Sequence, residues 1–152
     1  MGSIISRSSP IDTSIFELIQ IRPSAPGAGN DFSYICPANT RLELLFISGQ
    51  LTNAAALSGH APDLKIVGDG SLPVKRSLWR TSISGLIGSY PFTFVQGNHL
   101  ATSIISPSTV LYEFGREWFM IPGWDLTLEF TNMTGDVSLS KFSLLFKRWV
   151  LP

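Results

Sequence analysis

The residues that could support catalysis or metal binding are few and far apart along the chain. The 152-residue sequence contains two histidines, His60 and His99, and a single cysteine, Cys36. A zinc site needs three or four convergent ligands at recognisable spacing, and these three side chains show none. We therefore expect no metal site and no cofactor. A lone cysteine is usually a small buried apolar residue, so Cys36 is expected to be structural.

Two glutamates offer the best candidates for acid–base chemistry. Glu113 and Glu117 are four residues apart, so on one strand they would share a face. Paired carboxylates supply the acid and the base in glycosidases. Arg116 lies between them, however, and such a charge pattern is more typical of a solvated face or a subunit contact. The sequence also contains no Gly-x-Ser-x-Gly elbow for a nucleophilic serine. We expect the protein not to be an enzyme.

The charge balance argues against several classes of partner. Lys plus Arg and Asp plus Glu number 11 each, so the formal net charge is zero, and charged residues make up only 14%. A neutral chain has little long-range attraction for nucleic acid or for an anionic membrane. No apolar stretch approaches the roughly 20 residues of a membrane span. We expect neither partner, nor a small-molecule ligand. Low charge instead favours a protein that works in an assembly.

Aromatic residues concentrate between positions 112 and 124. Aromatic residues and arginine are enriched at protein interfaces, so this segment is a candidate subunit interface, formed by Tyr112, Arg116, Glu117 and Trp118. One alternative is that these aromatics belong to the core. Another is that Trp118 and Trp124 are stacking platforms for a sugar.

Short apolar runs separated by Gly, Pro, Asn and Ser recur along the whole chain. This texture predicts an all-β fold, specifically an antiparallel jelly-roll-like β-sandwich of about eight strands. Residues 1–12 are expected to form an extended N-terminal arm and residues 13–152 the β-sandwich domain. The runs that read as strands are residues 16–21, 32–35, 42–51, 64–67, 77–84, 92–95, 101–105, 110–114, 126–130 and 142–149.

Two of these runs carry more specific expectations. Residues 42–51 are apolar on both faces, with Leu42, Leu44 and Phe46 predicted on one face and Leu45 and Ile47 on the other. Such a strand is expected to lie centrally in the core.

The second expectation concerns the strand that follows Pro122 and Gly123. These two residues suit the middle of a type II turn. Trp124 then has the same parity as Leu126, Leu128 and Phe130, so its side chain should face the core with theirs.

Two stretches resemble a known family. One runs from Arg22 to Leu45, through Pro37-Ala38-Asn39, and continues at residues 51–55. The other is residues 121–128, followed by Gly135-Asp136 and residues 147–149. They resemble small jelly-roll virion proteins of tailed bacteriophages, in which a Pro-Ala-Asn turn introduces a long core strand and a Pro-Gly-Trp turn opens the penultimate strand. The match covers both ends of the chain but not its middle, residues 58–110.

The resemblance implies a capsid decoration, or cement, protein that binds the outer phage capsid and stabilises it. It implies a homotrimer whose other partner is a major capsid protein. The protein would be made in the bacterial host cytoplasm and located on the virion surface. Ile4, Ile5 and Arg7 of the arm are then candidates for capsid attachment. The alternative is a carbohydrate- or receptor-binding jelly-roll module of a phage head or tail fibre.

Overall fold

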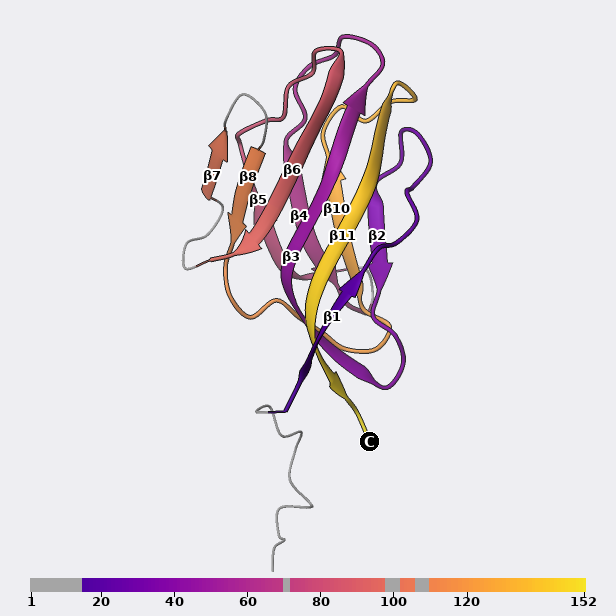
Figure 1. The fold of residues 1–152 in the computed structure, drawn as a ribbon, viewed down its shortest axis with the longest axis vertical. Helices are drawn as coiled ribbons and strands as arrows, with labels where there is room; N and C mark the ends of the chain where they lie inside the picture. Colours follow the sequence, from indigo (N-terminus) through magenta and orange to yellow (C-terminus); the bar gives the residue numbers. More distant parts are fainter. Residues whose placement is uncertain (1–14, 70–71, 98–101, 106–109) are drawn as a thin grey trace, which may run out of the picture.

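The computed structural model describes residues 15–69, 72–97, 102–105 and 110–152, and the side chains of all of these except 102–105 (Figure 1). This part of the chain is all-β and contains no α-helix, so it has no helix that could cross a membrane. Its eleven strands are β1 (Glu17–Ile21), β2 (Phe32–Ile35), β3 (Thr40–Asn53), β4 (Pro62–Val67), β5 (Pro73–Leu78), β6 (Gly88–Gln96), β7 (Thr102–Ile105), β8 (Val110–Phe114), β9 (Phe119–Met120), β10 (Asp125–Phe130) and β11 (Val137–Val150).

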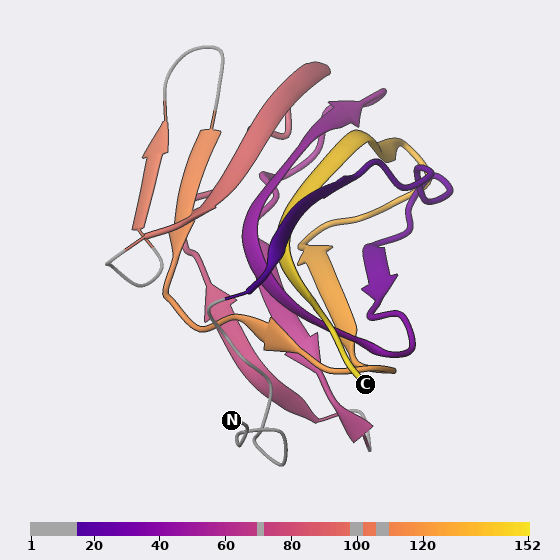
Figure 2. The same cartoon turned by 60° about the horizontal axis from the view of Figure 1, so that its bottom comes forward.

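The strands form two sheets packed as a sandwich. The larger sheet has the order β1-β11-β3-β6-β8-β7, with β9 added beside β3, and the smaller has the order β2-β10-β4-β5. Consecutive strands repeatedly change sheet, as β1 to β2, β3 to β4 and β10 to β11 do. Figure 2 shows β2 and β10 facing β3 and β11 across the core. The predicted jelly-roll-like β-sandwich is confirmed.

The strand count and one pairing differ from the prediction. The described residues form eleven strands rather than about eight, because short strands such as β9 lie beside the long ones. The sheets are also not wholly antiparallel, since β6 and β8 pair in parallel. The physical reason is that β7 and β8 pair with each other in antiparallel orientation, and β8 rather than β7 lies next to β6. β8 therefore runs in the same direction as β6.

Most predicted strands are present, and two have the predicted bounds. β2 and β8 span 32–35 and 110–114, as expected. The prediction for 77–84 was wrong: β5 ends at Leu78, and Ile83 makes only an isolated bridge to His60. Ile83 and Trp79 are nevertheless buried. The alternation of apolar and polar residues that suggested a strand therefore belongs to a loop in which Trp79 and Ile83 are buried.

A bulge in β3 changes which of its side chains face the core. Phe146 pairs with Leu44 while Leu145 pairs with Phe46, so Leu45 is an extra residue in β3. The bulge reverses the parity of everything after it. Leu44 and Ile47 consequently both lie in the core, whereas Phe46 does not share their face. The expected split of 42–47 into two alternating faces was therefore wrong.

The core between the sheets is rich in aromatic rings. Phe32 stacks on Phe142 at 4.1 Å between centroids, and Phe94 stacks on Tyr112 at 4.8 Å. Trp124 packs against the same core, as predicted, although it is only partly buried. The turn before it also has the predicted form, because the Trp124 N–H donates to Ile121 O at 3.0 Å and Gly123 has φ 85°.

Candidate functional site

Two of the four predicted interface residues belong to the core. Tyr112 and Trp118 are each 0% exposed, so neither side chain has surface to offer a neighbouring subunit. The Tyr112 hydroxyl donates to Thr81 O at 3.1 Å, and burial raises the pKa of this phenol. Trp118 lies edge-on to Phe114 at 5.2 Å. The structure therefore corrects the interface assignment of both residues in favour of the core.

The other two predicted interface residues, Arg116 and Glu117, are exposed in the segment between β8 and β9. They border a polar hollow of about 480 Å³ on the outer side of the larger sheet. The polar hollow is lined by Glu43, Gln96, Gly97, Arg116, Glu117 and Lys147.

The floor of the polar hollow is a buried carboxylate. Glu43 is 9% exposed; it accepts a hydrogen bond from Gln96 Nε2 at 3.0 Å and lies 3.7 Å from Lys147 Nζ. Partnering of this kind offsets the cost of burying a charge. The polar hollow therefore contains a compensated structural carboxylate, and its geometry does not require a catalytic role for Glu43.

Glu113 and Glu117 do not form the face-sharing pair that their spacing allowed. β8 ends at Phe114, and Glu117 has the left-handed φ of 67°. Glu113 instead lies beside Gly97, where an added Cβ would be 2.7 Å from Glu113 Oε2. β8 ends before Glu117, so strand parity does not apply to the two carboxylates.

An aromatic cluster adjoins the polar hollow on the same face. The Arg41 guanidinium lies 4.2 Å from the centroid of Phe119 and 5.4 Å from that of Trp149. Phe16 contacts Trp149 at 5.7 Å, and Lys147 Nζ lies 4.8 Å from the Phe16 centroid. Cations over aromatic faces are attracted by the ring quadrupole. The aromatic cluster (Phe16, Arg41, Phe119, Lys147, Trp149) thus joins the chain's first strand region to its last.

Sequence reasoning missed this aromatic cluster because its members are distant in sequence. The register pairs Trp149 with Arg41, Lys147 with Glu43, and Glu43 with Phe119. Directly opposite residues share a face, so strand pairing alone brings these side chains together. The sequence showed that Phe16 and Trp149 are aromatic and lie near the two ends of the domain, but it did not show that they are in contact.

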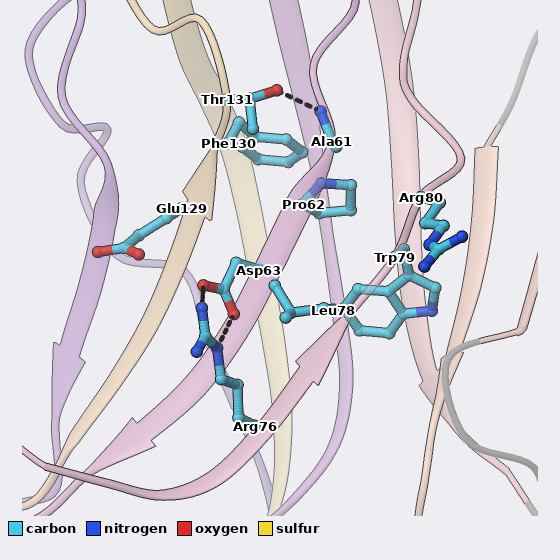
Figure 3. A pocket seen from close by; sticks show the side chains of 10 residues that line it. All are labelled: Ala61, Pro62, Asp63, Arg76, Leu78, Trp79, Arg80, Glu129, Phe130 and Thr131. Atoms are coloured by element: carbon cyan, nitrogen blue, oxygen red, sulfur yellow. Dashed lines mark hydrogen bonds and ion pairs between the residues drawn. The ribbon is translucent and has the colours of Figure 1, made fainter.

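A second pocket, of about 470 Å³, lies on the smaller sheet (Figure 3). Its charged side is the pair of Arg76 and Asp63, joined by hydrogen bonds of 3.1 and 2.8 Å. Trp79 and Phe130 are 4% and 6% exposed, so neither presents an open ring face. The pocket is lined by Ala61, Pro62, Asp63, Arg76, Leu78, Trp79, Arg80, Glu129, Phe130 and Thr131.

The remaining candidate groups are dispersed. Cys36 is buried, with its sulfur 3.6 Å from Thr40 O, and burial raises the pKa of its thiol. His60 is buried between Asn53 and the Thr131 carbonyl. His99 lies outside the described residues, as do Ile4, Ile5 and Arg7. Within the described residues, no group of three His, Cys, Asp or Glu side chains could hold a metal ion.

Comparisons with known proteins show a distant structural similarity. No protein-family model and no curated protein sequence matches the chain. A solved structure of infectious bursal disease virus, Gx strain, is similar with a TM-score of 0.46 and 13% sequence identity. The alignment covers 97% of this chain and 36% of that chain, so this chain spans about a third of its length. A similarity this low does not identify a function.

Proposed function

We propose that this chain is a structural virion protein, specifically a capsid decoration protein that binds the outer surface of a bacteriophage capsid. In this proposal it is a homotrimer that contacts a major capsid protein. It is made in the bacterial cytoplasm, and it strengthens the shell by burying apolar surface across subunit joints rather than by catalysis. The sequence resemblance at the two ends of the chain suggests this role, and the distribution of exposed apolar side chains supports it.

The observation that carries the proposal is a concentration of exposed apolar side chains at one end of the sandwich. Ile15, Phe16, Leu18, Ile121 and Val150 are between 41% and 71% exposed. The registers of β1, β9 and β11 bring all five to the end of the domain where residues 1–14 join it. Exposed apolar patches of this kind mark interaction sites.

Attachment through the N-terminal arm remains part of the proposal. Ile4, Ile5 and Arg7 lie in residues 1–12, which shortly precede Ile15 and Phe16 of the apolar end in the sequence. We propose that the arm and the apolar end act together as one contact surface. Many modest contacts of this kind stabilise a shell because ligand binding favours the bound state by mass action.

A reconstitution experiment tests the proposal. Capsids are produced from the phage genome with the gene for this chain deleted, and purified protein is added back. We expect saturable co-sedimentation with the shell and a higher temperature of shell disruption. A variant with Ile4→Asp and Ile5→Asp should bind less, whereas Leu86→Glu, an exposed change elsewhere on the domain, should bind normally. Absence of binding by the unmodified protein would refute the virion role.

The carbohydrate-binding alternative gains no support from the site. Of its two candidate stacking platforms, Trp118 is fully buried and Trp124 packs against the core. Sugar recognition by stacking needs an open aromatic face. We therefore propose no second function.

A further inference from the structure

β1 is one of the two edge strands of the larger sheet, and β7 is the other. β1 pairs only with β11, from Glu17 opposite Arg148 to Ile21 opposite Leu144, and no other described strand lies beside it. Figure 1 shows it at the lower end of the sandwich, alongside β11. The backbone N–H and C=O groups on the outer side of an edge strand are available to a further strand.

The edge of β1 carries no unpaired charge. Its one charged residue, Glu17, forms an ion pair with Arg148 and accepts a hydrogen bond from Arg148 Nε at 2.7 Å. Gln20 likewise donates to Ser143 Oγ at 2.7 Å. Natural proteins protect edge strands with lysines and prolines, and β5, an edge of the other sheet, has Pro73 and Lys75. β1 contains neither a proline nor a lysine.

Apolar side chains are exposed along the same edge. Leu18 is 61% exposed, and the two residues before the strand, Ile15 and Phe16, are 71% and 41% exposed. Leu18 lies opposite Lys147, on the face that carries the aromatic cluster. An added strand with apolar residues at alternate positions would cover these side chains while pairing with the backbone.

The composition of residues 1–14 suits this role. The segment contains Ile4, Ile5 and Ile11, which have high β propensity, and its only charged residues are Arg7 and Asp12. Fourteen residues can extend over roughly 46 Å, and the five residues of β1 need only about 17 Å. The segment is therefore long enough to leave its own domain and still cover an edge.

The residues next to β1 favour a neighbouring copy over the chain's own edge. Pairing with its own β1 would require a tight reversal within residues 10–14. Tight hairpins favour Asn-Gly, Asp-Gly or Gly-rich turns, and this stretch, Pro-Ile-Asp-Thr-Ser, contains neither glycine nor asparagine.

We propose that residues 1–14 of each copy occupy the free edge of β1 in a neighbouring copy. This inference deepens the proposed function, on which it rests for its biological setting. The contact is heterologous, so it closes a ring when the rotation between copies allows, as in the proposed homotrimer. In this arrangement the arm and the edge at Leu18 join the copies, and they contribute to shell attachment indirectly, through avidity between the linked copies.

Two full-length variants and their mixture test the exchange. Leu18→Lys places a positive charge on the edge directly opposite Lys147, where like charges repel, but it leaves the arm intact, and Ile4→Asp with Ile5→Asp disables the arm but leaves the edge intact. We expect the unmodified protein to be oligomeric by light scattering and each variant alone to be monomeric. Mixed together, they should form a one-to-one heterodimer, because the intact arm of one docks on the intact edge of the other.

The controls make every outcome decisive. Leu86→Lys, which changes a similarly exposed leucine elsewhere on the domain, should remain oligomeric, and circular dichroism must show native folding for each variant. If Leu18→Lys fails to fold, Leu18→Asn replaces it, because asparagine disfavours strand pairing. A mixture that stays monomeric overturns the exchange. If the variant with Ile4→Asp and Ile5→Asp is dimeric, two β1 strands pair directly and the exchange is overturned. If the unmodified protein is monomeric, the arm does not join copies and the exchange is also overturned.

These measurements in solution do not depend on the virion. Complementation without shell binding would leave the strand exchange standing and refute the decoration role. If the protein binds shells but the two variants do not complement each other, the strand exchange is refuted and the decoration role stands.

Discussion

His60 Nε2 lies 2.8 Å from Asn53 Oδ1 in a fully buried position at one end of the sandwich. The other ring nitrogen, Nδ1, lies 2.9 Å from Thr131 O, and Asn53 Nδ2 donates to Ser84 O and Leu86 O at 2.8 and 3.1 Å. The two side chains therefore provide hydrogen-bond partners for loop carbonyl groups that make no hydrogen bonds within a sheet. One of the two histidines that first suggested chemistry thus has a structural role.

Replacing Asn53 should destabilise the domain more than its small side chain suggests. Asn53→Ala leaves a histidine nitrogen and the Ser84 carbonyl oxygen without this partner, whereas Leu86 O keeps the hydrogen bond from the Tyr90 hydroxyl. Unsatisfied buried groups cost about 1–3 kcal/mol each, so we expect a loss of at least about 2 kcal/mol in urea unfolding. Thr52→Ala, which removes the bond to Ser89 Oγ near the surface, is the matched control and should cost under about 1 kcal/mol.

Asp31 should give a pH-dependent difference in stability. Burial raises the pKa of this carboxyl above its ordinary value of 3.8, opposed by the hydrogen bond it accepts from Phe130 N–H. A raised native pKa means that ionisation costs the folded state relative to the unfolded chain, so stability is fully present below pH 3.8 and declines as pH rises. Asp31→Asn, which keeps an acceptor for Phe130, should be more stable than the unmodified protein at pH 7. Thermal melts across pH should show this advantage vanish below pH 3.8; a constant difference would contradict the assignment.

Cys36 should be inert in the folded protein. Its side chain is 1% exposed, and burial raises the pKa of the thiol, which reduces the fraction of reactive thiolate. Alkylation by iodoacetamide should be more than about tenfold slower in the native state than in urea. Equal rates in the two conditions would show that the residue is accessible.

Glu117 offers a test of local backbone strain. Its φ of 67° lies in the left-handed region, which costs a non-glycine residue about 1 kcal/mol or more. Glu117→Gly should therefore be more stable than Glu117→Ala by up to about 1 kcal/mol. Both variants lose the same carboxylate, so an identical unfolding midpoint would mean that the strain is negligible.

Substitutions of Trp118 and Arg116 should differ in their effect on the free energy of unfolding, because the first residue lies in the core and the second on the surface. Trp118→Ala removes a fully buried ring and is expected to cost about 3–5 kcal/mol, enough to unfold a marginal domain. Arg116→Ala should change the free energy of unfolding by about 0.5 kcal/mol or less. If Trp118→Ala melts like the unmodified protein, the tryptophan is not part of the core.

Local patterns in the sequence were enough to predict the fold class and several elements. The alternation of Leu126, Leu128 and Phe130 predicted β10 because side chains in a strand alternate between faces with a period of two. The turn at Pro122 and Gly123 was predictable because proline fixes its own φ and glycine accepts a positive one. These are properties of residues close together in the chain, so they need no knowledge of tertiary contacts.

Strand pairing decided which side chains are buried and which residues distant in sequence are in contact. Whether Tyr112 and Trp118 face the core or a neighbouring subunit depends on what packs over them, and alternation is equally compatible with either. The bulge at Leu45 exists only in relation to β11, and the parallel pairing of β6 with β8 depends on how a hairpin docks. Arg41 meets Trp149 only because β3 and β11 pair in one register. The sequence alone determined an all-β sandwich with little charge; the tertiary structure decided which face of each strand is buried, because burial is a property of pairs of elements and not of either one.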